Sequence, residues 1–186
     1  RIAETAMWMM DHIMNTQASL EFGAAFLRIP LRKSPAITHG DALELDWQNL
    51  LPAERCSYIV GNPPFVGAKY QSEFQRAQVR RIAGLGKTGG TLDYVAAWFL
   101  KAARYGQGYK VPFAFVSTNS IAQGEQVAQL WPALLDRNGM EIAFAHQTFA
   151  WGSEARGKAA VHVIVTGLEP RNAARPVKRL FSYPDI

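Results

Sequence analysis

In the stretch Ser57-Tyr58-Ile59-Val60-Gly61-Asn62-Pro63-Pro64-Phe65 a strand ends and a proline-rich loop begins. The short apolar run from Tyr58 to Val60 predicts a buried strand bounded by turn-forming residues. Proline has no N–H and a fixed φ, and it moves the residue before it out of the helical region. The loop is therefore stiff and extended, and it presents an amide side chain, a bare carbonyl and an aromatic face. These groups together suit a flat ring that carries an exocyclic amine.

The elements on both sides of this loop predict an α/β fold. Apolar residues at helical spacing predict helices over 1–16, 92–105 and 124–138, and we also interpret the polar, basic stretch 69–82 as a helix. Short runs with apolar residues predict strands over 36–43, 111–117, 140–146 and 160–168, the first running into a turn at Gly40-Asp41 and the second rich in valine and phenylalanine. No helix separates the last two strands, so we expect them to form an antiparallel hairpin at the edge of a mostly parallel sheet.

The composition excludes several classes of protein. A chain of 186 residues can build its own core, and Cys56 is the only cysteine, which indicates a reducing compartment such as the cytoplasm. The four histidines lack metal-ligand spacing, so we expect no metal. No apolar run approaches the ~20 residues of a membrane span, so we expect no membrane partner.

The positive charge is unevenly distributed. The formal net charge is only +5, but basic residues gather after the proline loop and near the C-terminal end, where either a solvated surface or phosphate contacts would explain them. They are Lys69, Arg76, Arg80, Arg81, Lys87, Lys101, Arg104 and Lys110, and then Arg171, Arg175, Lys178 and Arg179.

Two further patterns have weaker readings. Asp41 stands in the turn Gly40-Asp41 into which the predicted strand runs, where an aspartate can meet a ligand, although by itself it is more typical of a turn or a helix N-cap. Residues 84–90 match the glycine pattern of dinucleotide-binding loops. That motif requires a strand directly before it, and a basic polar segment stands there instead, so we interpret 84–90 as a flexible loop.

Four blocks in order resemble the amino-methyltransferases, specifically the methylase region of bifunctional type II restriction–modification enzymes. The blocks are Ile59–Ala68 with its Asn-Pro-Pro-Phe signature, Leu92–Trp98, Phe115–Val127 and Ala145–Trp151. The resemblance covers roughly residues 36–168. It implies part of a class I, Rossmann-like fold that uses S-adenosylmethionine to methylate N6 of an adenine flipped out of duplex DNA.

The resemblance also implies roles for single residues. Asn62, Pro63, Pro64 and Phe65 would form the catalytic loop. The Asn62 side-chain carbonyl and the Pro63 backbone carbonyl would accept the two hydrogens of the amine, and Phe65 would stack on the base.

Three more residues carry implied roles. Phe149 would stack on the other face of the base, with Trp151 in reserve, although Phe149 as a packing residue of the hairpin stays open. Asp41 would accept a hydrogen bond from the cofactor's adenine amine, and the Ala42 N–H would serve a ring nitrogen.

The chain also departs from the resembled family. The glycine-rich cofactor loop and the acidic residue for the ribose belong to the first two strands, and neither is present. We therefore expect a methyltransferase domain over 1–168 that is truncated on its N-terminal side. A basic linker over 169–186 would lead to a missing target-recognition region. Other segments of the same parent polypeptide would be its partners, and this chain alone would be inactive.

Two other functions remain open from the sequence. N4-cytosine methylation uses nearly the same amine chemistry, and the loop does not separate the two bases decisively. A non-catalytic DNA-binding module with a degenerate methylase fold would bind through phosphates, with an affinity that falls steeply as salt rises.

Overall fold

The computed structural model describes residues 2–23, 35–84, 86, 91–151, 161–173 and 176–183, which divide into two compact units, Arg1–Asp41 and Ala42–Ile186. In the first unit, helix α1 spans Ile2–Phe22, so the helix predicted over 1–16 is confirmed and is longer than expected. The strand predicted over 36–43 is wrong. Residues 35–39 form no regular element and residues 42–44 form a turn. A strand needs a neighbour for its N–H and carbonyl groups, and no described strand pairs with this segment.

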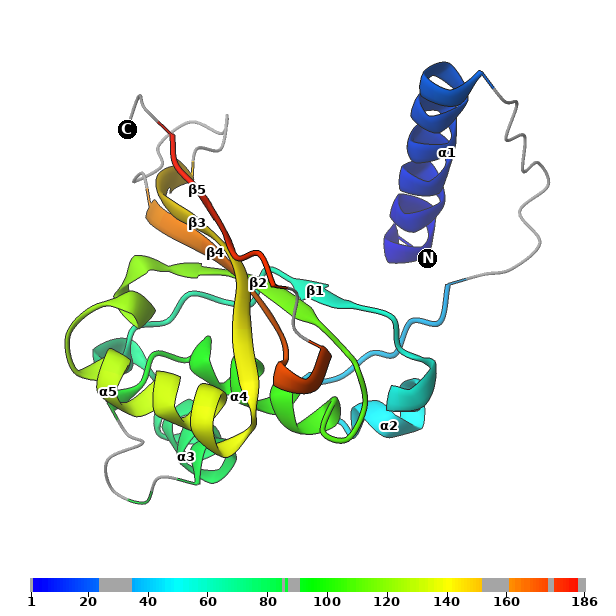
Figure 1. The fold of residues 1–186 in the computed structure, drawn as a ribbon. Coiled ribbons are helices and arrows are strands. Elements are labelled where there is room, and N and C mark those ends of the chain that lie inside the picture. The colour runs from blue at the N-terminus through cyan, green and yellow to red at the C-terminus, as the bar shows by residue number, and fades with distance from the viewer. Residues whose placement is uncertain are drawn as a thin grey trace. The chain divides into compact units, whose positions relative to one another are not determined.

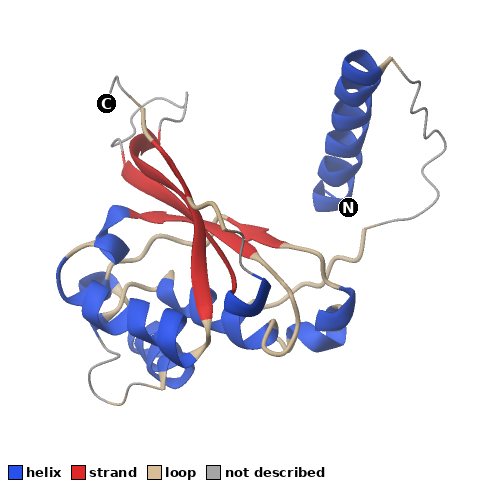
Figure 2. Ribbon diagram, in the orientation of Figure 1, coloured by secondary structure: helices blue, strands red, loops and turns tan. Residues whose placement is uncertain are grey.

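The second unit is built on a mixed five-stranded sheet (Figure 2). Its strands are β1 (Ile59–Gly61), β2 (Phe113–Thr118), β3 (Met140–Trp151), β4 (Val161–Pro170) and β5 (Arg179–Phe181). The spatial order is β1-β2-β4-β3-β5, with β1 parallel to β2, β5 parallel to β3, and β4 antiparallel to both of its neighbours. The predicted C-terminal hairpin is confirmed as β3 and β4, whereas the sequence did not predict β5.

Among the described residues of the second unit, four α-helices accompany the sheet. They are α2 (Trp47–Leu50), α3 (Glu73–Ala83), α4 (Ala96–Tyr105) and α5 (Gly124–Pro132), the last continued by a π-helical turn over Ala133–Arg137. Short 3₁₀ turns cover Ala53–Arg55, Ala68–Tyr70, Asn119–Ala122 and Arg171–Ala173. The helices α3, α4 and α5 lie on the same side of the sheet (Figure 1). Helix α3 begins with a capping box between Ser72 and Gln75 and ends at Gly84, whose φ of 61° favours glycine.

The core lies between the sheet and these helices. Alternate residues of β2 are buried, because successive side chains of a strand point to opposite faces. Phe99 of α4 packs edge-on against Phe113 and Phe115 of β2, with ring centroids 6.1 and 5.2 Å apart. The strand predicted from Tyr58 to Val60 forms as β1, but it is not a buried strand. Val60 is 77% exposed, and only Ile59 is half-buried.

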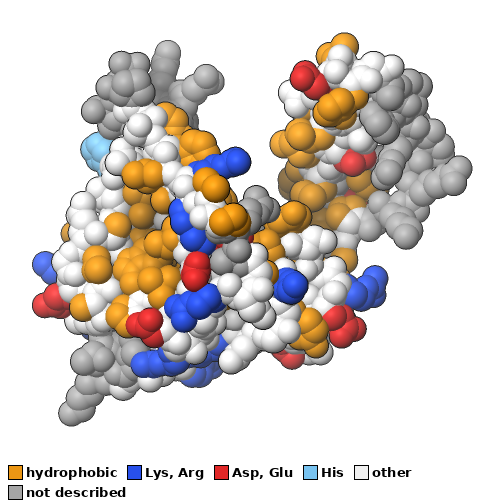
Figure 3. All heavy atoms as spheres, viewed as in Figure 1, with side chains coloured by type: hydrophobic (Ala, Val, Ile, Leu, Met, Phe, Trp, Pro, Cys, Tyr) orange, Lys and Arg blue, Asp and Glu red, His pale blue; other side chains and the backbone are white. Residues whose placement is uncertain are grey.

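One part of the helix side is less covered. A groove of about 800 Å³ runs between α5 and β3, lined by Val127 and Trp131 of α5 and by Ile142 and Ile164 of the hairpin. Figure 3 shows hydrophobic side chains gathered between α5 and β3. No helix of the described residues is both long enough and apolar enough to cross a membrane.

Candidate active site

The proline loop leaves the sheet at the carboxyl end of β1. Pro63 is buried and Phe65 is half-buried, whereas Asn62 and Pro64 are exposed. Among the described residues, none forms a hydrogen bond with the Asn62 side chain. The loop is thus anchored by one proline and keeps its amide group available to a ligand.

The chain just beyond Phe65 is held by residues 92–94, which we call the Asp93 turn. The Tyr94 N–H donates to the Val66 carbonyl at 2.9 Å, and the Ala68 N–H donates to Asp93 Oδ1 at 3.0 Å. Further along, Gln71 Nε2 donates to the Leu92 carbonyl at 2.8 Å. The Asp93 turn therefore fixes three successive points downstream of the loop.

The second oxygen of Asp93 reaches the end of the neighbouring strand. Asp93 Oδ2 accepts hydrogen bonds from the hydroxyls of Thr118, at 3.3 Å, and of Ser120. The Asp93 N–H donates to Gln126 Oε1 on α5 at 2.9 Å. One carboxylate, 7% exposed, thus joins the segment after β1 to the segment after β2.

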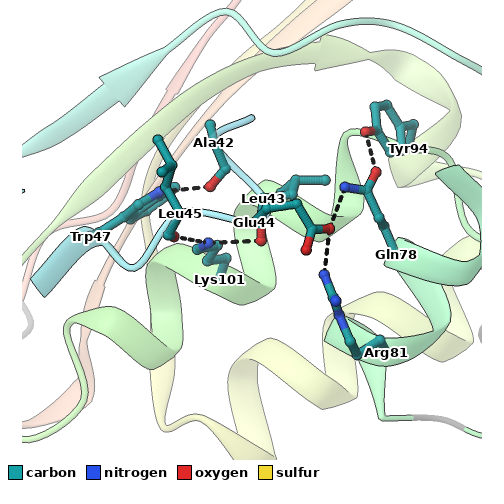
Figure 4. A network of polar contacts seen from close by, with 9 residues as sticks. All are labelled: Ala42, Leu43, Glu44, Leu45, Trp47, Gln78, Arg81, Tyr94 and Lys101. Atoms are coloured by element: carbon teal, nitrogen blue, oxygen red, sulfur yellow. Dashed lines mark hydrogen bonds and ion pairs between the residues drawn. The ribbon is translucent and has the colours of Figure 1, made fainter. Parts of the chain in front are cut away.

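A second polar network holds the segment that carries Ala42 (Figure 4). Lys101 Nζ donates to the Leu43 and Leu45 carbonyls at 2.8 and 2.5 Å, and Trp47 Nε1 donates to the Ala42 carbonyl at 2.8 Å. These bonds fix the turn over residues 42–47 against α4.

The same network continues to α3 through Glu44. Gln78 Nε2 and Arg81 both donate to Glu44 Oε1, at 2.6 and 2.5 Å, and Tyr94 donates its hydroxyl hydrogen to Gln78 Oε1 at 2.6 Å. The hydrogen bond from Arg81, followed by that from Gln78, lowers the pKa of Glu44. Tyr94 therefore serves both networks, through its backbone at the proline loop and through its hydroxyl at Gln78.

Phe149 lies at the same edge of the sheet as the proline loop. It pairs with Val163 of β4, and Val163 pairs with Thr118 at the carboxyl end of β2. Phe149 is half-buried, and its ring packs against Tyr183 with centroids 5.3 Å apart. The Trp151 side chain is outside what the structure describes. Asp41 ends the first unit, and its place relative to the proline loop stays a prediction.

No sequence pattern assigned a role to Asp93, Thr118 or Ser120, although all three lie in the blocks that carry the resemblance. One signal was available, because Asp93 stands within the apolar run Leu92-Asp93-Tyr94-Val95. A charged residue in such a run is buried only when it is paired or hydrogen-bonded. The partners of its carboxylate lie 25 to 27 positions away, and no local pattern identifies them. Within the described residues, no group of histidine, cysteine, aspartate and glutamate side chains could hold a metal ion.

Comparison with known proteins gives three consistent results. A family model described as the DNA-methyltransferase domain of MmeI matches residues 1–182. DNA methyltransferase A of Bacillus subtilis (strain 168) is 36% identical over 172 residues, which cover 91% of this chain and 20% of that protein. The structure of the type IIL restriction–modification enzyme MmeI in complex with DNA is 47% identical, with a TM-score of 0.84 over 98% of this chain and 24% of that one. This chain thus spans only about a fifth to a quarter of the length of these relatives.

Proposed function

We propose a function from one premise: the chain belongs to the family of MmeI DNA-methyltransferase domains. It is a methylase region of a type II restriction–modification enzyme, with a five-stranded α/β sheet similar to that of MmeI. The finer proposal is transfer of a methyl group from S-adenosylmethionine to N6 of an adenine flipped out of duplex DNA. The single observation that carries it is the exposed Asn62 amide on a loop whose next residue, Pro63, is buried.

The proposed chemistry needs hydrogen-bond acceptors more than it needs a base. The lone pair of an adenine amine is delocalised into its ring, so the nitrogen is a poor nucleophile. The Asn62 side-chain carbonyl and the Pro63 backbone carbonyl would bind its two hydrogens and favour a pyramidal nitrogen with the lone pair directed outward. Fixed dipoles that match the developing geometry stabilise the transition state without a covalent intermediate. A fixed loop also suits methyl transfer because near-linear attack depends on positioning.

The proposed base site lies between the proline loop and Phe149. Both are at one edge of the sheet, and the order β1-β2-β4-β3 separates their strands by three inter-strand steps. At about 4.8 Å for each step, the two strands are roughly 14 Å apart. Side chains that reach inward from both sides would narrow this gap, so Phe65 and Phe149 would each offer a ring to the flipped base. Stacking offsets part of the cost of unstacking the base from the duplex.

The residues proposed for the methyl donor are Asp41 and Ala42. Support for Ala42 comes from the network around residues 42–47, which fixes its backbone through Trp47 and Lys101. The sheet, with its parallel β1 and β2 and its C-terminal hairpin, fits the later strands of a class I methyltransferase. The strands that would carry the glycine-rich loop would come from the parent polypeptide. We therefore expect this chain by itself to bind S-adenosylmethionine weakly, and calorimetric titration that gives a micromolar Kd would contradict that expectation.

The decisive experiment compares the full-length parent with its Asn62→Ala variant. DNA treated with each protein and S-adenosylmethionine is digested to nucleosides and analysed by mass spectrometry. We expect N6-methyladenine from the unchanged protein and a loss of at least about 100-fold in the variant, the size seen when one transition-state hydrogen-bonding group is removed. Methylation that survives the substitution would overturn the catalytic assignment. N4-methylcytosine as the product would overturn the choice of adenine.

A further inference from the structure

We propose that Asp93 is a positioning residue that fixes where the Asn62 loop lies relative to the methyl-transfer site. The proposal rests on the proposed function and adds to it a residue that contacts neither the base nor the cofactor in that scheme. The two oxygens of the Asp93 carboxylate accept hydrogen bonds from two different segments of the chain. Oδ1 accepts from the Ala68 N–H beyond the proline loop, and Oδ2 accepts from the hydroxyls of Thr118, the last residue of β2, and Ser120.

Aspartate suits this position because it is short and only accepts hydrogen bonds when ionised. Three donors converge on it: the Ala68 N–H and the hydroxyls of Thr118 and Ser120. The two hydroxyl oxygens are also 2.6 Å apart, so the hydroxyls and the carboxylate form one continuous network. Bonds to a charged acceptor are shorter and stronger than neutral ones, and low exposure strengthens them further.

The turn around Asp93 is itself held from both sides. Its N–H donates to Gln126 at the start of α5, and the next residue, Tyr94, bonds Val66 through its N–H and Gln78 through its hydroxyl. We call the hydrogen bonds of Asp93 and Tyr94 to Val66 and Ala68 the Asp93 clamp. Val66 directly follows Phe65, so this clamp begins one residue after the proposed catalytic loop. Contacts with β2 and α5, and not only the connection to β1, therefore fix the position of the loop.

A clamp of this kind acts on the chemical step. If Asp93 is truncated, Ala68 loses its acceptor and the proline loop can shift relative to the end of β2. A misplacement of about 1 Å far from the reacting atoms can cost about 100-fold in rate. Affinities depend on other contacts, so the loss falls on kcat and leaves KM for DNA and for S-adenosylmethionine within about twofold.

The test uses the full-length parent with four single substitutions and Asn62→Ala as the reference. Asp93→Ala removes both acceptors. Asp93→Asn keeps an oxygen for Ala68 and places an amide against hydroxyls that can rotate to accept from it. Ser120→Ala removes one contact with little loss of volume. Asp136→Ala is the matched control, because Asp136 is an exposed aspartate of the turn that follows α5.

We expect kcat to fall about 100-fold in Asp93→Ala, to recover to within about tenfold of the unchanged protein in Asp93→Asn, and to stay unchanged in Asp136→Ala. Thermal unfolding and the two KM values accompany each measurement. If Asp93→Ala does not fold, Asp93→Asn and Ser120→Ala decide, and we expect a loss of about three- to tenfold in kcat from each.

If Asp93→Ala folds, three results would overturn the inference. The first is a folded Asp93→Ala protein with the kcat of Asp136→Ala. The second is a raised KM with kcat retained. The third is an equal fall in kcat in the alanine and asparagine variants. If Asp93→Ala does not fold, unchanged kcat in both Asp93→Asn and Ser120→Ala also overturns it. The Asn62→Ala reference distinguishes a failure of the proposed function from a failure of the positioning role. Full activity in that variant rejects the proposed function itself, whereas its inactivity beside an unaffected Asp93 series rejects only the positioning role.

Discussion

Replacing Lys101 with methionine should loosen the turn over residues 42–47. The Lys101 ammonium donates to two backbone carbonyls, those of Leu43 and Leu45, and lies 5.3 Å from the centre of the Trp47 ring. Methionine keeps the length of the side chain and its apolar contacts but cannot donate a hydrogen bond. The substitution therefore tests the charge and its hydrogen bonds rather than the packing.

The expected cost follows from these contacts. A hydrogen bond to a charged group contributes about 1.5–3 kcal/mol, and an exposed cation–π contact adds about 0.5–1 kcal/mol. Lys101 is half-buried, so water can replace part of what is lost. We therefore expect the turn to open more easily by about 2 kcal/mol, which corresponds to about 30-fold faster local opening.

Hydrogen exchange followed by mass spectrometry in the full-length parent measures this opening directly. The informative amides lie in α2 and at its C-cap. The Asn49 N–H donates to the Asp46 carbonyl, and the N–H of the C-cap residue Leu51 donates to the Trp47 carbonyl. Lys110→Met is the matched control, because Lys110 is an exposed lysine in the turn after α4. Exchange over residues 42–51 that is equal in Lys101→Met and Lys110→Met would refute the reasoning. Because Ala42 belongs to the same turn, we also expect Lys101→Met to raise KM for S-adenosylmethionine and to leave KM for DNA unchanged.

Two further predictions concern the sheet and α4. A Cβ added at Gly167 would lie 2.1 Å from Phe144 Cε1, so Gly167→Ala should lower the free energy of unfolding by about 2–3 kcal/mol in urea titrations, and far less in a Phe144→Ala background. Equal costs in the two backgrounds would show that Phe144 is not the obstacle. Burial, and next the neighbouring Cys56, raises the pKa of Tyr105 to about 12 from an ordinary value of 10.0. The folded state therefore holds this proton more tightly, and its stabilisation is fully present below pH 10 and is lost as pH rises through about 12. Absorbance titration at high pH should show a late tyrosine transition that is smaller by one tyrosine in Tyr105→Phe, and identical curves for the two proteins would contradict the assignment.

The elements that local patterns describe were predictable from sequence. Helix α3 has its capping residues at Ser72 and Gln75 and its left-handed glycine at Gly84, all within the segment itself. The β3–β4 hairpin followed from the lack of a helix between two strand-like runs. Strand β5 was missed because its three residues, Arg179–Phe181, form a strand only by pairing with β3. Three residues are too few to show a strand pattern, and the basic residues Arg175 and Lys178 just before them indicate a tail.

The failed strand at 36–43 illustrates the opposite case. Its sequence suits a strand, but an isolated strand leaves its ladder groups unpaired, and pairing depends on residues far away in the chain or in the parent. The proline loop was predictable because proline restricts its own backbone. The contacts of Asp93 were not, since they join segments 25 to 27 positions apart that meet only after the sheet has formed.

The second unit separates what stabilises the fold from what shapes the candidate site. Apolar packing is centred on Phe99 and the buried face of β2, whereas polar contacts gather at the carboxyl edge of the sheet around Asp93. A substitution such as Phe99→Ala removes a fully buried aromatic side chain and should cost about 3–5 kcal/mol of stability. Each single hydrogen bond at Asp93 contributes less to stability than this, because water offers nearly equivalent partners in the unfolded chain. These hydrogen bonds matter because they are directional, so each one fixes the position of one atom relative to another. Mutations of the core should therefore change how much protein is folded, and mutations of the Asp93 turn should change how well the folded protein works.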